Sequence, residues 1–463
     1  MKTIDYSALG LPPGDESLDL ARGAVAATRD GGISAREALR HLRRAVRNPE
    51  EYVDDPYFGA LAAFLRHHRD QFVPRPAPAP YARWGEDIEE TSVRQMENAC
   101  ALPISVRGAL MPDAHLGYGL PIGGVIATRA AVIPYAVGVD IACRVKMTVL
   151  DMPTDAIDSR KEVLVNAIEG ETRFGIGAHF KRRRAHSVMD EDWQVSPVTR
   201  RVKDTAWRQL GTSGSGNHFV EFGTFQVDDP SVGLEAGTYL ALLSHSGSRG
   251  AGANVADHYS KLAMSHRPEL PTELRQLAWL DLASDAGQEY WAAMELMGKY
   301  AEANHACIHR HIAAALGVEV LLDLENHHNF AWKEEHDGEE VIVHRKGATP
   351  AGKGVLGIIP GSMATSTYVV RGKGHPASLN SSSHGAGRRM SRKKAKATFT
   401  WPEAKDVLAE RGVTLLSAGL DEVPMVYKNI DEVMAAQADL VETLGRFEPK
   451  LVKMARSGEP PED

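Results

Sequence analysis

Histidines in short turns rich in glycine or serine are the residues of this sequence best placed to do chemistry. Three such turns adjoin apolar, strand-like runs: GTSGSGNHFVEF at 211–222, LLSHSGSRGAG at 242–252 and ENHHNFAW at 325–332. A turn held by a rigid strand can aim its side chain at a ligand. Any single histidine is more often a hydrogen-bonded structural residue, so the prediction rests on the three turns together.

A carboxylate and a thiolate add to these imidazoles. Asp140 and Cys143 stand three residues apart in GVDIACR, where they could share one metal ion or bridge two. Alone, this spacing is more often explained by a buried structural cysteine. Together with the histidines, it supplies the ligands expected of a transition-metal site. Two divalent ions close together would suit phosphoryl or nucleotidyl transfer.

Positive charge is concentrated in one segment of an acidic chain. The net charge is −8, yet residues 341–400 hold eleven Lys or Arg and no Asp or Glu. Such a local field attracts polyanions, although a solvated basic surface is the alternative. Glycine-rich stretches at 345–363 and 369–376 have the composition of a backbone that wraps phosphates, without a Walker A motif. Arg249, in a turn of small residues, also suits a phosphate.

The basic segment contains a candidate nucleophile. His384 in SSSHGAGRRMSRKKA has small neighbours that leave it open to approach, and Arg388, Arg389 and Arg392 follow it. A neutral imidazole facing a phosphate, with cations offsetting developing charge, could form a phosphoramidate. A histidine that only hydrogen-bonds a phosphate explains the same residues equally well.

The elements that must position these residues predict an α+β fold. From about Tyr81, short apolar strands alternate with glycine-rich turns and longer helical stretches such as 280–316, without a regular βαβ rhythm. Residues 15–72 are predicted to be helical, with Ser34 as an N-cap, and residues 401–453 to be mostly helical. We divide the chain into a helical N-terminal extension (1–73), a Pro-rich linker (74–80), a catalytic domain (81–455) and a disordered tail (456–463).

Composition sets broad limits on the protein class. The chain has 463 residues, of which 43% are hydrophobic and 25% charged, as in ordinary globular proteins. No apolar run approaches the roughly 18–20 residues of a membrane helix. The N-terminus shows no secretory signal, and three widely spaced cysteines make a disulfide framework improbable. These features predict a cytoplasmic protein that does not associate with membranes.

The ordered motifs GTSGSGNHFVE, HSGSRG, RKGAT, IPGSM and SHGAGR resemble those of the RNA-splicing ligase RtcB family. The similarity runs from about Trp84 to Lys453. It implies one RtcB-like catalytic domain that uses GTP and manganese to join RNA ends. One end bears a 3′-phosphate or 2′,3′-cyclic phosphate, and the other bears a 5′-hydroxyl. It also implies RNA as the partner, with an archease-type protein as a candidate activator.

The resemblance also implies roles for individual residues. His384 matches the histidine that takes GMP. His328 is preferred to His327 because the family's ligand directly precedes an asparagine, here Asn329. Cys143 would bridge two manganese ions, with the complete ligand set Asp140, Cys143, His218, His245 and His328. The guanylate contacts would be Asn217, Glu221, Ser362, Ala386, Gly387, Arg388, Tyr427 and Lys453.

Several positions depart from the family pattern. The family typically has GVDIGCGM around the bridging cysteine, whereas this chain has GVDIACRVKM. If either of the glycines replaced by Ala142 and Arg144 normally takes a positive φ, the replacement costs about 1 kcal/mol or forces a different turn. Arg144 could place a cation beside the metals and weaken their binding. Tyr118 and the pair at 120–121 replace the family's usual lysine and Ala-Thr.

Two other functions fit the sequence. The first is a divergent paralogue that acts as a metal-dependent RNA-end phosphoesterase without sealing. The second is a non-catalytic RNA-binding protein that keeps the basic groove. A protein that only binds RNA has no need for the five predicted metal ligands and His384. The sequence does not distinguish the phosphoesterase from a ligase.

Overall fold

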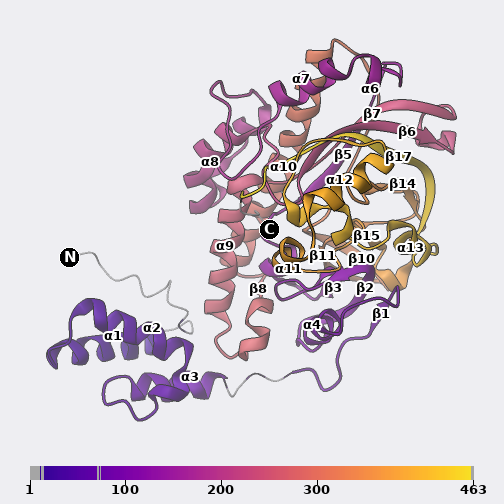
Figure 1. The fold of residues 1–463 in the computed structure, drawn as a ribbon. Helices are drawn as coiled ribbons and strands as arrows, with labels where there is room; N and C mark the ends of the chain where they lie inside the picture. Colours follow the sequence, from indigo (N-terminus) through magenta and orange to yellow (C-terminus); the bar gives the residue numbers. More distant parts are fainter. Residues whose placement is uncertain (1–10, 12–14, 70–71, 73, 460–463) are drawn as a thin grey trace.

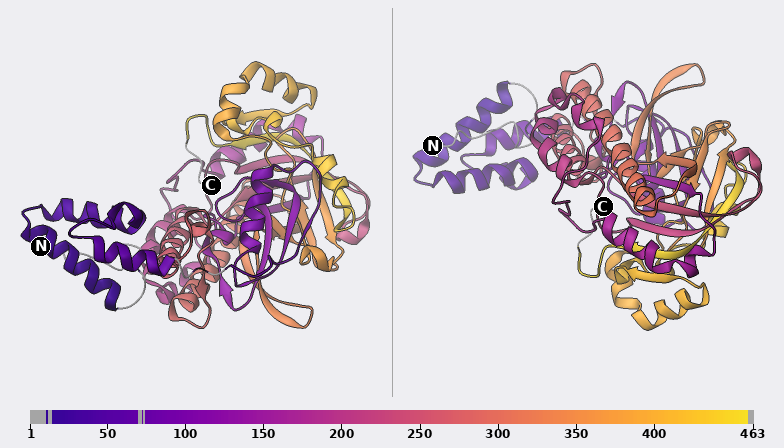
Figure 2. Two further views of the ribbon diagram at one scale, coloured as in Figure 1. Left: turned by 90° about the horizontal axis from the view of Figure 1, so that it is seen from below. Right: turned by 90° about the horizontal axis from the view of Figure 1, so that it is seen from above.

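The computed structural model describes residues 11, 15–69, 72 and 74–459 (Figure 1). Two β-sheets and the helices around them form the body of the molecule, and three N-terminal helices stand to one side of it (Figures 1 and 2). Helices and strands follow one another irregularly, which confirms the predicted α+β class. Within the described residues, no helix is both long and apolar enough to span a membrane.

The larger sheet has eight strands in the order β13-β14-β17-β6-β7-β5-β9, with β16 beside β17. The two outermost strands, β9 and β13, lie close to each other. The side-chain amide of Asn326 on β9 donates to the carbonyl of Ile358 on β13 (3.3 Å) and accepts from the N–H of Ile358 (2.9 Å). The sheet therefore curls around apolar side chains such as Met147, Phe225 and Phe447. Its strands are β5 (Arg144–Leu150), β6 (Phe219–Val227), β7 (Gly237–Ser246), β9 (Val320–His327), β13 (Leu356–Ile359), β14 (Thr367–Gly372), β16 (Thr414–Ser417) and β17 (Val441–Met454).

The smaller sheet contains strand β2, whose Asp113 contacts His384. Its order is β1-β2-β3-β11-β10, and its strands are β1 (Tyr81–Arg83), β2 (Ser105–His115), β3 (Ile122–Thr128), β10 (Phe330–His336) and β11 (Glu339–Lys346). Two short pairs complete the strands: β4 (Ala131–Val132) with β8 (Leu280–Asp281), and β12 (Ala348–Pro350) with β15 (Ser381–Ser383). The β12–β15 pair ends directly before His384.

Helix α10 supports the larger sheet from outside. The Ser284 side chain caps its first turn by accepting from the N–H of Gly287, and Ile308 and Ile312 pack against strands β5 to β7. The helices are α1 (Asp15–Asp30), α2 (Ala35–Arg47), α3 (Gly59–Arg69), α4 (Glu90–Cys100), α5 (Pro134–Val137), α6 (Ala156–Ser159), α7 (Lys161–Glu171), α8 (Pro197–Gln209), α9 (Arg249–His266), α10 (Asp285–Leu316), α11 (Arg392–Thr398), α12 (Trp401–Glu410) and α13 (Ile430–Ala435).

The three N-terminal helices have a core of their own, which includes Leu42, Phe58 and Leu61. Ser34 caps α2 as predicted, since its side chain accepts from the N–H of Glu37. Residues 74–80 form neither helix nor strand, and backbone hydrogen bonds tie them to the end of α4. The domain boundaries drawn from the sequence stay predictions, and residues 1–10, 12–14, 70–71 and 73 of the extension lie outside the described residues.

The prediction that residues 401–453 are mostly helical is wrong for their last part. Residues 441–454 form β17, which lies between β14 and β6 in the larger sheet. Pro449 argues against a central strand because proline cannot donate to a neighbour, but the pairing with β6 is irregular between Pro449 and Leu451. Of the predicted disordered tail, residues 460–463 lie outside the described residues.

Candidate metal centre and adjoining cavity

Strand direction brings the five predicted metal ligands to one edge of the larger sheet. Strand β5 runs antiparallel to both β7 and β9, so its start lies beside their ends. Val145 is opposite His245, and Arg144 is opposite His327. Strand β6 starts beside the end of β7, with Phe219 opposite His245. Residues before β5 and β6 therefore meet residues at or after the ends of β7 and β9.

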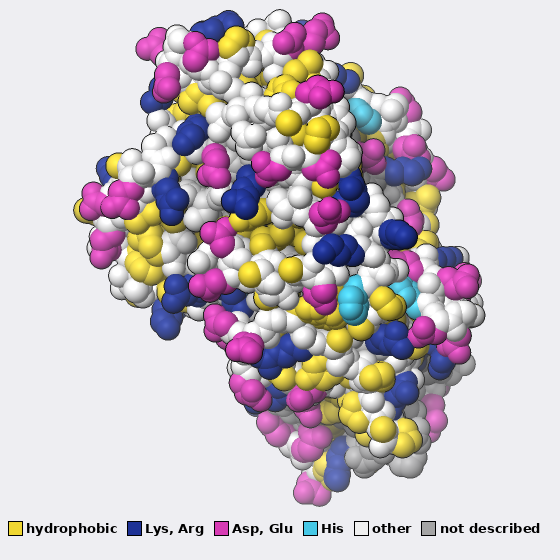
Figure 3. All heavy atoms as spheres, turned by 90° about the vertical axis from the view of Figure 1, so that its right-hand side faces the viewer, with side chains coloured by type: hydrophobic (Ala, Val, Ile, Leu, Met, Phe, Trp, Pro, Cys, Tyr) yellow, Lys and Arg dark blue, Asp and Glu magenta, His cyan; other side chains and the backbone are white. Residues whose placement is uncertain are grey.

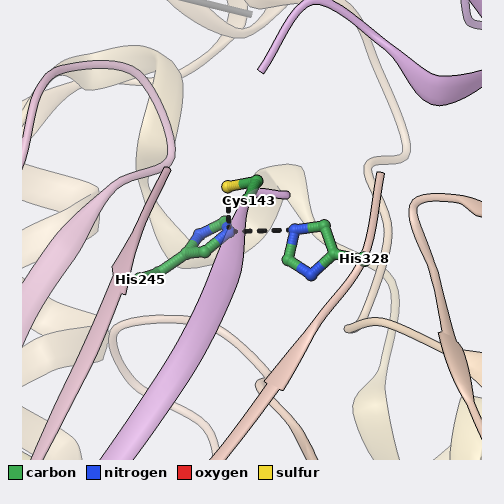
Figure 4. Close-up of side chains that lie close together, drawn as sticks. All are labelled: Cys143, His245 and His328. Atoms are coloured by element: carbon green, nitrogen blue, oxygen red, sulfur yellow. Dashed lines mark hydrogen bonds between the residues drawn. The ribbon is translucent and has the colours of Figure 1, made fainter. Parts of the chain in front are cut away.

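Two groups of three potential ligands share Cys143. One contains Asp140, Cys143 and His218, and the other contains Cys143, His245 and His328. Within each group the ligand atoms lie within 4.8 Å of one another, and all five residues are buried. Sγ of Cys143 lies 3.3 Å from Nε2 of His218. It also lies 3.1 Å from Nε2 of His245, which is 3.2 Å from Nε2 of His328 (Figure 4). The thiol therefore lies where it could contact metals held by either group.

Asp140 is held in place by the turn after β7. Its Oδ1 accepts from the backbone N–H of Ser248 at 2.9 Å. A Cβ at Gly247 would lie 2.0 Å from its Oδ2, so only glycine leaves room for the carboxylate. Burial by itself raises the pKa of Asp140, but His218 and Arg249 hold that pKa below its ordinary value. Asp140 is therefore a carboxylate at neutral pH.

Arg249 differs from its predicted role. It begins α9 and is buried, and its guanidinium donates to Nδ1 of His218 at 2.9 Å. It also lies 4.0 Å from the Asp140 carboxylate. Instead of standing open to a phosphate, Arg249 contacts two of the predicted ligands.

Two histidines of the centre, His245 and His328, are poised as neutral ligands. Burial lowers the pKa of His245 to about 3, helped by nearby His218 and His384, and burial also lowers the pKa of His328 well below its usual range. Neutral imidazole is the form that binds a metal. Nδ1 of His245 donates to the carbonyl of Asn217 at 3.2 Å, which directs Nε2 towards Cys143.

His327 does not join this group. Its ring packs against the rings of Phe330 and Trp332, with centroids 5.2 and 5.1 Å away. The structure thus brings His328, the histidine preferred from the sequence, to the other ligands.

Asn329 connects the turns that carry the ligands. Its side chain donates to the carbonyl of Asp140 (3.3 Å) and accepts from the N–H of Gly347 (2.8 Å), while its own carbonyl accepts from Ala142 (2.8 Å). Ala142 has a φ of 56°, the left-handed conformation that favours glycine. The strain anticipated for this departure, about 1 kcal/mol, is therefore present.

Arg144 does not approach the metal ligands, so the expectation of a cation beside them is wrong. Alternate side chains of a strand point to opposite faces, and Arg144 points away from the side of Cys143. Its guanidinium pairs with Glu325 on β9 at 2.5 Å and donates to the carbonyl of Gly298 on α10 at 3.1 Å. Its charge is thereby neutralised on the far face of the sheet.

His384 is oriented by a buried carboxylate from the smaller sheet. Nδ1 of His384 lies 2.7 Å from Oδ2 of Asp113, which also accepts from the His384 N–H at 3.2 Å. Asp113 is fully buried. A Cβ at Gly387 would lie 2.1 Å from the Asp113 carbonyl oxygen, so the loop after His384 passes over Asp113 only because this residue is glycine. The His384 ring centroid is 4.8 Å from that of His328, which places His384 beside the metal ligands.

A cavity of about 620 Å³ joins His384 to the metal ligands. Its lining contains His384, the five predicted ligands and seven of the eight predicted guanylate contacts. These seven are Asn217, Glu221, Ser362, Ala386, Gly387, Arg388 and Tyr427. Burial raises the pKa of Glu221 well above its ordinary value, which favours a neutral carboxylic acid in the cavity.

Lys453 is the predicted contact that does not line the cavity, although its neighbours Val452 and Met454 do. Its ammonium lies 2.7 Å from the carboxylate of Glu169 and 5.4 Å from the centroid of the Phe174 ring. In this structure Lys453 is therefore directed away from a ligand in the cavity.

Arg388 and Tyr427 belong to a charged cluster in the cavity wall. Both contact the buried carboxylate of Glu422, which Arg388 approaches at 3.2 Å. The guanidinium lies 5.5 Å from the centroid of the Tyr427 ring, and Arg392 pairs with Glu422 as well. The cluster holds two cations at the side of the cavity.

Sequence reasoning did not single out Asp113, Glu422 or Lys346. Lys346 lines the cavity, donates to the carbonyl of Tyr118 at 2.5 Å, and has a pKa that burial lowers to about 7. Asp113 lies in MPDAHLGYG at 111–119, which contains one histidine and two glycines, and Lys346 lies in the RKGAT motif. The presence of an ionisable residue within such a motif could have identified Asp113 and Lys346 as candidate site residues. Glu422 lies outside these motifs.

The chain is similar in sequence to proteins of one known family. The family model described as "tRNA-splicing ligase RtcB" matches residues 95–197 and 191–454. The "RNA-splicing ligase RtcB" of Escherichia coli (strain K12) is 34% identical over 397 residues, covering 79% of this chain and 95% of that protein. The "tRNA-splicing ligase RtcB" of Nanoarchaeum equitans is 33% identical, covering 79% of this chain and 91% of that protein. The resemblance predicted from the motifs is confirmed: the chain belongs to the RtcB family.

Proposed function

We propose that this chain is a GTP- and manganese-dependent RNA ligase. It joins RNA ending in a 3′-phosphate or 2′,3′-cyclic phosphate to RNA beginning with a 5′-hydroxyl. The observation that carries the proposal is the Asp113–His384 pair, because its His384 lines the same cavity as the five ligand side chains. Family membership supports the reaction class, since the relatives are named as RNA- or tRNA-splicing ligases.

The ligand side chains fit a pair of transition-metal ions. Carboxylate, thiolate and neutral imidazole form a donor set for such ions. Because Gly247 has no side chain, the carboxylate of Asp140 has room to lie beside the other ligands. One ion would be held by Asp140, Cys143 and His218, and the other by Cys143, His245 and His328. When bound, manganese would offset negative charge on the reacting phosphates.

His384 is the proposed nucleophile. The carboxylate of Asp113 accepts a hydrogen bond from Nδ1–H, so the neutral ring keeps its lone pair on Nε2. Nε2 attacks the α-phosphorus of GTP, a P–N bond forms, and the bond to the leaving pyrophosphate breaks. The ring becomes positively charged in this step, and the buried carboxylate 2.7 Å away stabilises that charge.

Two further transfers complete the reaction. An oxygen of the RNA 3′-phosphate attacks the phosphorus on His384, which breaks the P–N bond and returns a neutral ring. A 2′,3′-cyclic end must first be opened by water. The 5′-hydroxyl of the second RNA then attacks the activated 3′-phosphate and releases GMP. Activation is needed because GMP is a far better leaving group than oxide.

The cavity residues would hold the nucleotide during these steps. Asn217 and Glu221 enter from the start of β6, Ser362 from the IPGSM turn, and Tyr427 from its contact with Glu422. Arg388, anchored by Glu422, would face the phosphates. Lys453 would contact guanylate only after leaving Glu169.

A joining assay tests the proposal. The protein is incubated with manganese, GTP, an RNA ending in a 3′-phosphate and a second RNA beginning with a 5′-hydroxyl, with an archease-type activator in a parallel arm. Joined product is expected, but none when the second RNA begins with a 5′-phosphate, because no hydroxyl can then attack. Loss of the 3′-phosphate without joining in either arm would contradict the ligase and favour the RNA-end phosphoesterase.

A further inference from the structure

A second concentration of positive charge lies outside the cavity. Residues 173–184, RFGIGAHFKRRR, carry five Lys or Arg and no acid, and they pack against helix α8. Arg200 and Trp207 lie seven residues apart on α8, a spacing that places both on one face of a helix. We call this surface the basic–aromatic patch, and it consists of Arg173, Phe180, Lys181, Arg182, Arg183, Arg200 and Trp207.

Aromatic rings hold the loop of the patch in a defined shape. The guanidinium of Arg183 lies 5.0 Å from the centroid of the Trp207 ring, and that of Arg184 lies 3.8 Å from the centroid of Phe180. The Trp207 indole donates to the carbonyl of Arg184 at 3.1 Å. Arg184 is itself buried and pairs with Glu171 at 2.8 Å. The loop is therefore ordered before any partner binds.

Three cations of the patch remain available to a partner. Lys181, Arg182 and Arg200 are exposed, and within the described residues none of them forms an ion pair. One acid lies within the patch, because Asp204 on α8 pairs with Arg183 at 2.7 Å, whereas basic and acidic side chains are interspersed over the whole face shown in Figure 3. Trp207 adds an aromatic surface, since 38% of this residue is exposed. Cations without ion-pair partners can bind the phosphates of a single-stranded nucleic acid, and an exposed aromatic ring beside them can stack on its bases.

The patch is joined directly to the wall of the cavity. The carbonyl of Arg173 accepts from the N–H of Ser213 at 2.8 Å, and Gly175 donates to the carbonyl of Gly214 at 2.8 Å. These partners belong to the glycine-rich turn that carries Asn217 into the cavity lining. An RNA strand that leaves the cavity across this turn would meet the patch next.

We propose that the basic–aromatic patch binds the sugar–phosphate backbone of substrate RNA beyond the end that reacts in the cavity. This inference rests on the proposed function, because it assumes an RNA end at His384. Phosphate contacts of this kind add affinity without selecting a sequence, and base stacking on Trp207 is equally tolerant of sequence. The patch therefore favours long RNA over short RNA with the same reactive end.

The test compares two charge-reversed variants of the full-length protein. Lys181→Glu/Arg182→Glu alters the patch, and Arg36→Glu/Arg43→Glu alters the same number of exposed cations on α2 as a matched control. Fluorescence anisotropy measures binding of a labelled RNA of tRNA-half length and of a trinucleotide with the same 3′-phosphate. Neither GTP nor joining is needed for this readout.

The patch variant is expected to bind the long RNA at least about tenfold more weakly and the trinucleotide unchanged. In a neutral Lys181→Gln/Arg182→Gln variant, the slope of log affinity against log salt should fall by about 1.5. Unchanged binding of the long RNA overturns the inference, as does an equal loss in the α2 control. If patch-dependent binding occurs but the wild type never takes up GMP, the inference stands and the proposed function fails.

Discussion

Oδ2 of Asp113 lies 2.7 Å from Nδ1 of His384, although the two residues are 271 positions apart in the chain. Asp113 comes from β2 in the smaller sheet, and His384 follows β15 in the basic segment. The contact fixes which ring nitrogen carries the proton and which faces the cavity. Asp113 is therefore a positioning residue for the proposed nucleophile.

Asp113→Asn should slow transfer of GMP to His384 by about 10²–10⁴-fold, because the amide favours the wrong tautomer and leaves the charged ring without a counter-ion. Single-turnover kinetics with saturating GTP measures the rate. A positioning role predicts that the rate constant falls while GTP affinity and thermal stability stay near those of the wild type. A rate within about threefold of the wild type would contradict it.

Gly247→Ala should disrupt the metal group that contains Asp140. A Cβ at this position would lie 2.0 Å from Oδ2 of Asp140 and would displace the carboxylate. Metal analysis after dialysis against manganese is expected to show less bound manganese than the wild type. Gly250→Ala is the matched control, since its Cβ would meet only the flexible end of Gln209, at 3.1 Å. Equal manganese content in both variants would contradict the role of Asp140.

Ala142→Gly should raise the free energy of unfolding by about 1 kcal/mol, because glycine adopts the φ of 56° without strain. Urea unfolding of the metal-free protein measures the difference. The variant should bind as much manganese as the wild type. A variant less stable than the wild type would show that the left-handed conformation at 142 carries no strain.

His344 should make stability depend on pH. Burial lowers its pKa to about 4, and its Nε2 accepts from the backbone N–H of Ile133 at 2.9 Å. Between pH 6.5 and 4 the unfolded chain binds a proton that the folded protein excludes. This contribution to stability is therefore complete above pH 6.5 and falls with pH, by up to about 3 kcal/mol near pH 4.

Urea unfolding at a series of pH values, with a chelator present, measures this dependence in the wild type and in His344→Asn. The free energy of unfolding of the variant should depend less steeply on pH than that of the wild type. The difference in slope should be about 1.4 kcal/mol per pH unit between pH 6 and 4.5, the value for one proton. Identical slopes would show that His344 is not the group concerned.

Local sequence patterns were enough to predict the strand-end turns that hold the ligands. Apolar runs beside Asp140, His218, His245 and His328 indicated strands, and the structure places all four residues at one edge of a sheet. The α+β class follows from the same patterns. Which strands are neighbours is decided by tertiary pairing, so the sequence alone could not show that Cys143 is common to both ligand groups.

Contacts between distant segments account for what the sequence did not predict. The partner of His384 lies in another sheet, and Arg144 is directed by Glu325 on a strand that follows it by more than a hundred residues. Strand β17 was predicted to be helical, and the irregular pairing that accommodates its Pro449 forms only against β6. Ala142 shows the reverse case, since strain was anticipated from the two glycines replaced in this turn, and of the two replacements only Ala142 has a positive φ.

Mapping the covalent adduct tests the central claim most directly. The protein is incubated with manganese and GTP labelled at the α-phosphate, without RNA, and the labelled site is located by mass spectrometry of peptides. One GMP on His384, labile in acid and stable in alkali, is the predicted result, with no adduct in His384→Ala. Label on another residue, or an adduct that persists in His384→Ala, would contradict the account.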